Sequence, residues 1–413
     1  MTLNSPITEE MTRQLPVVDR SQRKSTHLGA AILALALGSF AIGITEFSMM
    51  GLLQEAVTDL GIDLSQGGNL VSAYALGAVV GGPLLSVVAA RFERRALVIS
   101  LLGLFVLGHA VSLLSPTYGM LLAGRFLSGL PHGAYLAGAS LLAAGLVGPA
   151  KRARAASWVM VGLSVANVVG VPVVTWLGQN FGWRWMLGVA LAAAVVTGVM
   201  IRAVIPAQKV EASVSMGNEL SALKSPRLWL GLLLAIVGFS GMFALYAYIS
   251  PVLTETAGLA PAMLPFALAI YGLGMVVGNM LGGRLADISV LGTVCGALIT
   301  LMASLLLFSM TSDVLPLALL FMTMVGISGQ ALAPALQMHL IDCAPHAPQI
   351  SSALTHSAFN LANAFGAWFG GAVIGIGWGL KAPSLLGGIA ALLGAGMAAA
   401  MLLAQRSRKA ARA

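Results

Sequence analysis

The stretch PAQKVEASVSMGNELSALKSPR, at residues 206–227, is the one long hydrophilic segment inside an otherwise apolar chain. It lies near the middle of the 413 residues, and apolar runs long enough to cross a bilayer stand on both sides of it. A bilayer-spanning helix takes about 20 residues, so twelve such helices take up about 240 residues. The segment therefore divides the sequence into two halves with six predicted spans each.

The predicted spans alternate with short loops along both halves. They lie at about 28–53, 68–90, 96–115, 117–147, 155–178 and 183–205, and then at about 228–253, 263–286, 290–311, 314–340, 350–379 and 382–404. We therefore predict an all-α integral membrane protein whose twelve transmembrane helices form two six-helix lobes. The predicted units are a tail over 1–27, a lobe over 28–205, the linker over 206–227, a lobe over 228–404 and a tail over 405–413.

The composition supports a membrane protein and excludes an ordinary soluble enzyme. Hydrophobic residues make up 58% of the chain and charged residues only 9%, whereas about a quarter of a soluble domain is charged. The net charge is +8, and in a membrane protein such an excess reflects basic residues on the cytoplasmic side. We therefore expect the lipid bilayer as a partner, no nucleic acid, and a monomer.

The positions of the basic residues predict the orientation of the chain. If both termini are cytoplasmic, nineteen of the 22 basic residues lie on that side. The exceptions are Arg184 and Lys381, which then face outward, and Arg125, which lies within a span. The outward loops carry acidic residues instead: Glu55, Asp59, Asp63, Glu255 and Asp313. The positive-inside rule therefore predicts that both termini are cytoplasmic.

Two charged residues lie at similar depth inside predicted spans. Counting about 1.5 Å per helical residue puts Glu46 roughly 10 Å, and Arg125 roughly 12 Å, below the outer face. Ionisable groups at such depth are costly and are usually functional. We expect Glu46 and Arg125 to take part in proton or substrate handling, and a static structural ion pair is the alternative.

Further polar residues inside the spans are candidates for a central substrate cavity. His132 follows Pro131 deep in the fourth span. The other candidates are Asn167, Gln330, Asn360 and Asn363, for which hydrogen bonds between helices are the alternative. His109 and His356 lie near the ends of their spans, and we interpret them as structural.

Several kinds of chemistry have no signature in this sequence. It contains no phosphate-binding loop of the form G-x-x-x-x-G-K-[ST], so this chain is not expected to hydrolyse ATP. It contains neither an HExxH motif nor a cluster of metal ligands, and Cys295 and Cys343 lie in different segments. We therefore predict no metal, no cofactor and no enzymatic activity.

Several separate blocks resemble the major facilitator superfamily, and within it the twelve-span drug:proton antiporters. These blocks are ALGSFAIGITEFSMMGLLQEAVTDLGI (36–62), SAYALGAVVGGP (72–83), LLAGRFLSGLPHGA (121–134) and AFNLANAFGAWFGG (358–371). The resemblance extends over about 28–404 and is greatest to bacterial permeases of the arabinose-efflux and chloramphenicol-export type. It implies that Arg125 takes part in proton coupling.

Two further motifs follow from this resemblance. ANVVGVPVVTWLG (166–178) is similar to the antiporter motif of the fifth span, in which Gly170 and Pro172 shape the outward constriction. The resemblance also implies a cytoplasmic gate after the second and eighth spans. Its residues here are Arg91, Arg94, Arg95, Gly283 and Asp287, and the first of these loops lacks the aspartate and the glycines of the family pattern.

The function implied is proton-coupled efflux of a small molecule, either sugar or drug-like, by alternating access. The expected location is the bacterial inner membrane, which the chain crosses many times. The first alternative is an importer or facilitator of a small metabolite on the same fold. A receptor or regulatory membrane protein is a second alternative, and a membrane-embedded enzyme comes last.

Overall fold

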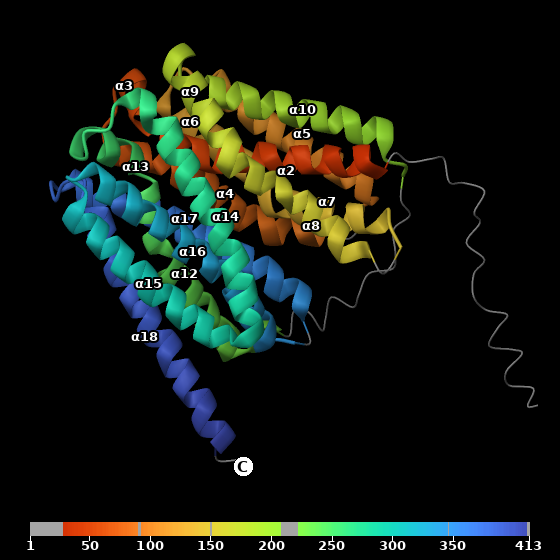
Figure 1. Cartoon of the computed structure of the whole chain (residues 1–413). Coiled ribbons are helices and arrows are strands. Elements are labelled where there is room, and N and C mark those ends of the chain that lie inside the picture. Colours follow the sequence, from red (N-terminus) through yellow and green to blue (C-terminus); the bar gives the residue numbers. More distant parts are fainter. Residues whose placement is uncertain (1–27, 90–91, 149–150, 208–221, 346, 411–413) are drawn as a thin grey trace, which may run out of the picture.

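The computed structural model describes residues 28–89, 92–148, 151–207, 222–345 and 347–410, and the regular secondary structure of this part of the chain is helical (Figure 1). The first half contains α2 (Leu28–Gly51), α3 (Leu53–Leu60), α4 (Leu64–Ala89), α5 (Arg94–Leu113), α6 (Tyr118–Gly129), α7 (His132–Gly145), α8 (Arg152–Val165), the π-helical turn η3 (Ala166–Gly170), α9 (Val171–Phe181) and α10 (Trp185–Val204). These helices form the N-terminal lobe.

The second half has the same arrangement of long helices. It contains the short turn η4 (Ala222–Lys224), α12 (Pro226–Tyr246), α13 (Ile249–Pro251), η5 (Val252–Thr256), η6 (Pro261–Met263), α14 (Leu264–Ile288), α15 (Val290–Thr311), α16 (Leu315–Cys343), α17 (Pro348–Gly375) and α18 (Ala382–Ala410). The predicted all-α membrane fold is confirmed. Residues 208–221 of the linker lie outside the described residues, and the exact lobe boundaries stay predictions.

Ten helical stretches of the described chain are long and apolar enough to cross a membrane. The two predicted spans outside this set are the fourth and the eleventh. The fourth is interrupted at Leu130 and Pro131 between α6 and α7, where proline has no backbone N–H to donate. The eleventh, α17, is long enough but contains a histidine, two asparagines and several hydroxyl side chains. Twelve spans therefore fit the structure.

Main-chain contacts at glycines hold neighbouring helices of each lobe together. In the N-terminal lobe, a Cβ atom on Gly77 of α4 would collide with the main-chain carbonyl of Phe126 on α6. A Cβ atom on Gly81 would collide with that of Leu130, which follows α6. In the C-terminal lobe, Gly278 and Gly282 of α14 meet carbonyls of α16 in the same way. Glycine permits such close contact because it has no side chain.

The two lobes meet at the end of the bundle that carries α3 and the segment over η5 and η6, which we call the outer end because the charge pattern predicts it outside. Figure 1 shows the lobes touching there and diverging toward the other end. Gln54 of α3 donates to Glu255 over 2.6 Å and accepts from Thr254 over 3.2 Å. Ser72 of α4 donates to the Ala364 carbonyl of α17 over 2.8 Å. The lobes are therefore joined at the outer end.

Candidate functional site

Arg125 lies on α6, and its surface is 0% exposed. Its Nε donates to the Leu70 carbonyl of α4 over 3.2 Å, while Nη1 and Nη2 both donate to the Thr45 carbonyl of α2, over 3.3 and 3.2 Å. The centre of the guanidinium lies 4.7 Å from the centroid of the Tyr74 ring, a cation–π contact. The buried cation is therefore held by neutral groups from two neighbouring helices.

Glu46 is the residue after Thr45 on α2, and it is half-buried. Ion pairs between described residues join Arg184 to Asp59 and Lys381 to Asp313, and Glu46 takes part in neither. The two residues expected to act together therefore lie on helices that the hydrogen bonds of Arg125 connect, but in this conformation they form no ion pair. The static ion pair considered as an alternative is not what the structure shows.

His132 is joined to the surroundings of Arg125 through Tyr74. The Tyr74 hydroxyl lies 3.0 Å from His132 Nδ1, and the two rings make an edge-on contact with centroids 5.8 Å apart. Both side chains are almost wholly buried. The fourth span thus contributes Arg125 and His132 to one polar cluster, because Tyr74 contacts both of them.

Two members of this cluster were not found by sequence reasoning. The sequence indicates no role for Tyr74, and the position of His109 near the end of a span favours a structural role. The His109 ring is 0% exposed, and its Nε2 is 2.9 Å from the Thr45 hydroxyl oxygen. A histidine inside an apolar helix was the one available signal, and depth alone did not show that it faces α2.

The predicted cavity amides include buried atoms without partners. Asn360 Nδ2 donates to the His356 carbonyl over 3.0 Å, but its Oδ1 has no hydrogen-bond partner among the described residues. Both amide atoms of Asn363 and the Oδ1 of Asn167 are likewise unpaired there, as is the Tyr271 hydroxyl. Gln330 is half-buried on α16. Unpaired polar atoms of this kind are available to a hydrogen-bonding ligand.

The proposed antiporter motif coincides with a change of helix geometry. Residues Ala166–Gly170 form a π-helical turn, and Pro172 stands at the start of the α-helix that follows. A Cβ on Gly170 would lie 2.9 Å from atoms of Ile44 and Phe40 on α2. π-Helical turns inside α-helices occur frequently at functional sites.

The predicted gate residues are spread over both lobes. Arg91 lies outside the described residues. Arg94 begins α5, and Arg95 donates to the Ile205 carbonyl of its own lobe over 2.8 Å. Gly283 and Asp287 lie on α14, where Asp287 is exposed and Gly283 has open space around it. The gate assignment stays a prediction.

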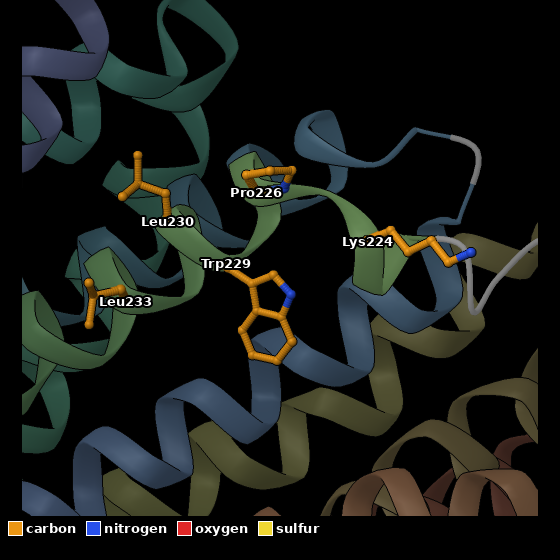
Figure 2. A pocket seen from close by; sticks show the side chains of 5 residues that line it. All are labelled: Lys224, Pro226, Trp229, Leu230 and Leu233. Carbon is orange, nitrogen blue, oxygen red and sulfur yellow. The ribbon is translucent and has the colours of Figure 1, made fainter.

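The pocket drawn in Figure 2 lies away from this cluster. It has a volume of about 440 Å³ and is lined by the start of α12 and the end of the linker. Its lining residues are Lys224, Pro226, Trp229, Leu230 and Leu233. Lys224 is the one charged group among them, and none of the predicted site residues lines the pocket. We therefore do not assign it to the substrate.

Comparison with known proteins gives the same family throughout. The family model described as "Major Facilitator Superfamily" matches residues 35–355. The chain is 38% identical to "Inner membrane transport protein YdhP" of Escherichia coli over 360 residues, which are 87% of this chain and 92% of that protein. It is 32% identical to "Chloramphenicol resistance protein" of Streptomyces lividans, covering 80% of this chain and 86% of that protein.

The fold is shared with solved transporter structures. The crystal structure of the D-xylose-proton symporter superposes with a TM-score of 0.72, covering 90% of this chain and 97% of that chain. The sequence identity is 16%, so this likeness concerns the fold alone. The predicted family resemblance is confirmed.

Proposed function

Because this chain belongs to the Major Facilitator Superfamily and is a secondary transporter that works by alternating access, we propose that it exports a small sugar or drug-like molecule in exchange for protons. In this proposal Glu46 carries the proton and Arg125 sets the electrostatic environment of the site. The chain is a multi-pass membrane protein of a transporter family, and we propose no enzymatic activity for it.

The observation that carries the proposal is the position of Glu46. Its carboxyl is half-buried and has no ion-pair partner in the described chain, although the Arg125 guanidinium is bound to the carbonyl of the preceding residue. A carboxyl without a fixed cation can exist charged or neutral, and a conformational change that brings the cation nearer favours the charged form. Glu46 can therefore exchange a proton as the lobes move.

The unpaired amide atoms support a hydrogen-bonding substrate. Each buried polar atom left without a partner costs about 1–3 kcal/mol, so Asn167, Asn360, Asn363 and Tyr271 gain by binding a polar molecule between the lobes. His132 and Gln330 complete the proposed cavity. A relative named for chloramphenicol resistance supports a drug-like substrate. Gly170 and Pro172 then belong to the motif that limits leak.

The contacts at the outer end support an inward-facing conformation. The lobes are joined there by Gln54, Glu255 and Thr254, and they diverge toward the end at which α10 stops and α12 begins. With both termini cytoplasmic, as the charge pattern predicts, that end faces the inside. We assign the chain to the bacterial inner membrane as a monomer, with the gate over Arg91, Arg94, Arg95, Gly283 and Asp287 on the cytoplasmic side.

A reporter fused at residue 215 should be cytoplasmic, and one inserted near Asp59 or Asp313 should be outside.

The test uses the full chain in proteoliposomes with an imposed pH gradient. The probe is a labelled compound from an efflux screen of sugars and antibiotics in a host without its own pumps. We expect accumulation driven by the gradient and accompanied by proton release. Glu46→Gln should abolish driven accumulation and leave substrate–substrate exchange, whereas the control change Asp63→Asn at the exposed outer end should leave both.

Three results would contradict the proposal. Wild-type transport that moves no protons would remove the coupling. Restoration of driven transport in the double variant Glu46→Gln with Arg125→Gln would remove the carrier role of Glu46, because no titrating carboxyl would be left at the site. Accumulation of the labelled compound in the same direction as the proton flow would favour the alternative function, an importer on the same fold.

A further inference from the structure

His109 is a wholly buried histidine that the proposed transport cycle does not use. It lies on α5, and its Nδ1 is 2.9 Å from the Phe105 carbonyl of the same helix. A carbonyl oxygen only accepts hydrogen bonds, so Nδ1 carries the proton. In the neutral ring Nε2 is then an acceptor, and it points to the Thr45 hydroxyl oxygen on α2 at 2.9 Å.

The Thr45 hydroxyl has one proton and two acceptors within reach. They are Nε2 of His109 and the Ala41 carbonyl, which is also 2.9 Å away. If the proton went to the Ala41 carbonyl alone, a lone pair of the Thr45 hydroxyl oxygen would face the lone pair of His109 Nε2 at 2.9 Å, and both atoms are buried. A charged His109 would avoid this conflict, but it would add a second cation beside Arg125 in an apolar interior, which is costly. If the proton went to His109 alone, the Thr45 oxygen would face the Ala41 carbonyl oxygen in the same way. The hydroxyl therefore shares its proton between the Ala41 carbonyl and Nε2 of His109 in a three-centre bond.

The charged surroundings of His109 are sparse. Arg125 approaches it from α6, and Thr45 from α2. The titratable side chains of α7, His132 and Tyr135, are bonded to Tyr74 and to the Leu35 carbonyl. Charged residues of α10 stand at its two ends only, as Arg184 and Arg202. Thr45 is therefore the one polar side chain of another helix that is bonded to His109 in the described chain.

Thr45 connects three helices with its two polar groups. Its hydroxyl is bonded to His109 of α5, while its main-chain carbonyl accepts two N–H groups from Arg125 of α6. The next residue along α2 is Glu46. A bond that fixes the Thr45 side chain therefore also fixes the turn of α2 to which Arg125 is attached.

We propose that His109 is a positioning residue of the coupling site: by accepting the Thr45 hydroxyl it holds the turn of α2 that binds Arg125, and so keeps Arg125 away from Glu46 in this conformation. The inference rests on the proposed proton-carrying role of Glu46. Without the bond from Thr45 to His109, Arg125 is released toward Glu46 and holds it as a charged carboxylate.

The test measures how fast Glu46 reacts with dicyclohexylcarbodiimide in the full-length protein in lipid nanodiscs. The reagent takes the proton of a neutral carboxyl while the carboxylate oxygen adds to its central carbon, and the adduct rearranges to a stable N-acylurea. Mass spectrometry of the peptide containing Glu46 gives the labelled fraction. We expect His109→Leu and Thr45→Val each to lower the labelling rate at neutral pH at least threefold. Thr45→Ser should restore the wild-type rate, because it keeps the hydroxyl.

The matched control is Thr355→Val on α17. Thr355 is also 0% exposed and bonds the carbonyl four residues before it over 2.7 Å, but it has no second partner in the described chain. Its replacement should leave Glu46 labelling unchanged. Only monodisperse protein is labelled, so a loss of folded protein does not enter the rate. If His109→Leu does not fold, Thr45→Val removes the same bond from the other side.

The possible outcomes separate the two proposals. Equal labelling of Glu46 in wild type, His109→Leu and Thr45→Val would overturn the positioning role and leave the exporter intact. A wild-type Glu46 that is not labelled at any pH would overturn the proton-carrying role instead, and this inference with it. An equal loss of labelling in Thr355→Val would show that the effect is not specific to His109.

Discussion

The two lobes have the same glycine contacts but different chemistry beside them. In the N-terminal lobe Gly77 meets the carbonyl of Phe126, and in the C-terminal lobe Gly278 meets that of Ile327; each carbonyl lies 49 residues after its glycine. The residue before Phe126 is Arg125, whereas the residue before Ile327 is Gly326. The buried cation thus belongs to one lobe only.

The same correspondence extends to the partners of Arg125. Tyr74 stands three residues before Gly77, and the residue at that place before Gly278 is Met275. The second pair of equivalent carbonyls is that of Leu130, which Gly81 meets, and that of Ala331, which Gly282 meets. Two residues after Leu130 stands His132, whereas two residues after Ala331 stands Ala333. The comparison teaches that helix packing and site chemistry are separate: glycines build both lobes, while the cluster of Arg125, Tyr74 and His132 belongs to the first.

The largest effect is expected from changing Arg125 itself. Arg125→Gln removes hydrogen bonds to the Thr45 and Leu70 carbonyls, each worth about 1.5–3 kcal/mol for a charged donor, so driven transport should fall about tenfold or more. Transport per folded molecule in proteoliposomes is the measurement. The matched change Gly326→Ala meets Tyr271 atoms at 3.1–3.3 Å, a contact that a small shift relieves, and should change transport less than twofold. Equal losses would mean that the lobes do not differ as described.

A smaller effect is expected where the N-terminal lobe packs α2 against the π-helical turn. Gly170→Leu places a side chain where atoms of Ile44 and Phe40 lie 2.9 Å from the first added carbon, and overpacking costs about 1–3 kcal/mol. Thermal unfolding should therefore occur at a lower temperature, and transport should fall. Gly188→Leu on α10 is the control, since nothing lies within 4 Å of its Cβ position. If both variants unfolded and transported alike, the close contact would have no special role.

The smallest effect concerns the ion pairs at the outer ends of the lobes. Trp183 donates to Asp59 over 2.9 Å and Arg184 pairs with it, and these two bonds lower the pKa of the Asp59 carboxyl. A carboxyl with a lowered pKa stabilises the fold above its unfolded pKa of about 3.9, and this stabilisation is lost as the pH falls through the folded value. Because the pair is half exposed, Asp59→Asn should lower the melting temperature by only about 1–2 °C near neutral pH.

The comparison with the other lobe sharpens this prediction. Asp313 pairs with Lys381 over 2.5 Å without an indole donor, so Asp313→Asn should have a smaller effect than Asp59→Asn. The difference between wild type and Asp59→Asn should shrink as melting is followed to lower pH, through the lowered pKa of Asp59 in the folded state. A constant difference over the whole range would show that the carboxyl charge does not contribute.

Sequence reasoning found the charged members of the site but not their partners. Glu46 and Arg125 are conspicuous because charges are rare in an apolar span, and their similar depth follows from counting residues. Thr45 and Tyr74 are not conspicuous, since hydroxyl and aromatic groups occur in many spans, and His109 stands out only as a histidine near the end of a span. Which of these side chains face Arg125 depends on how α2, α4 and α5 are rotated about their axes. The short loops between the helices do not allow that rotation to be predicted from the sequence.

The sequence by itself determined the twelve apolar spans, the hydrophilic division at 206–227 and the asymmetry of basic residues, because each of these follows from transfer of side chains between water and lipid. Tertiary structure alone decided that Arg125 is bound to the carbonyls of Thr45 and Leu70 rather than to Glu46. The physical reason is that main-chain carbonyls are present at every residue. Their availability to a buried cation depends on how closely the helices approach, and no residue type announces it.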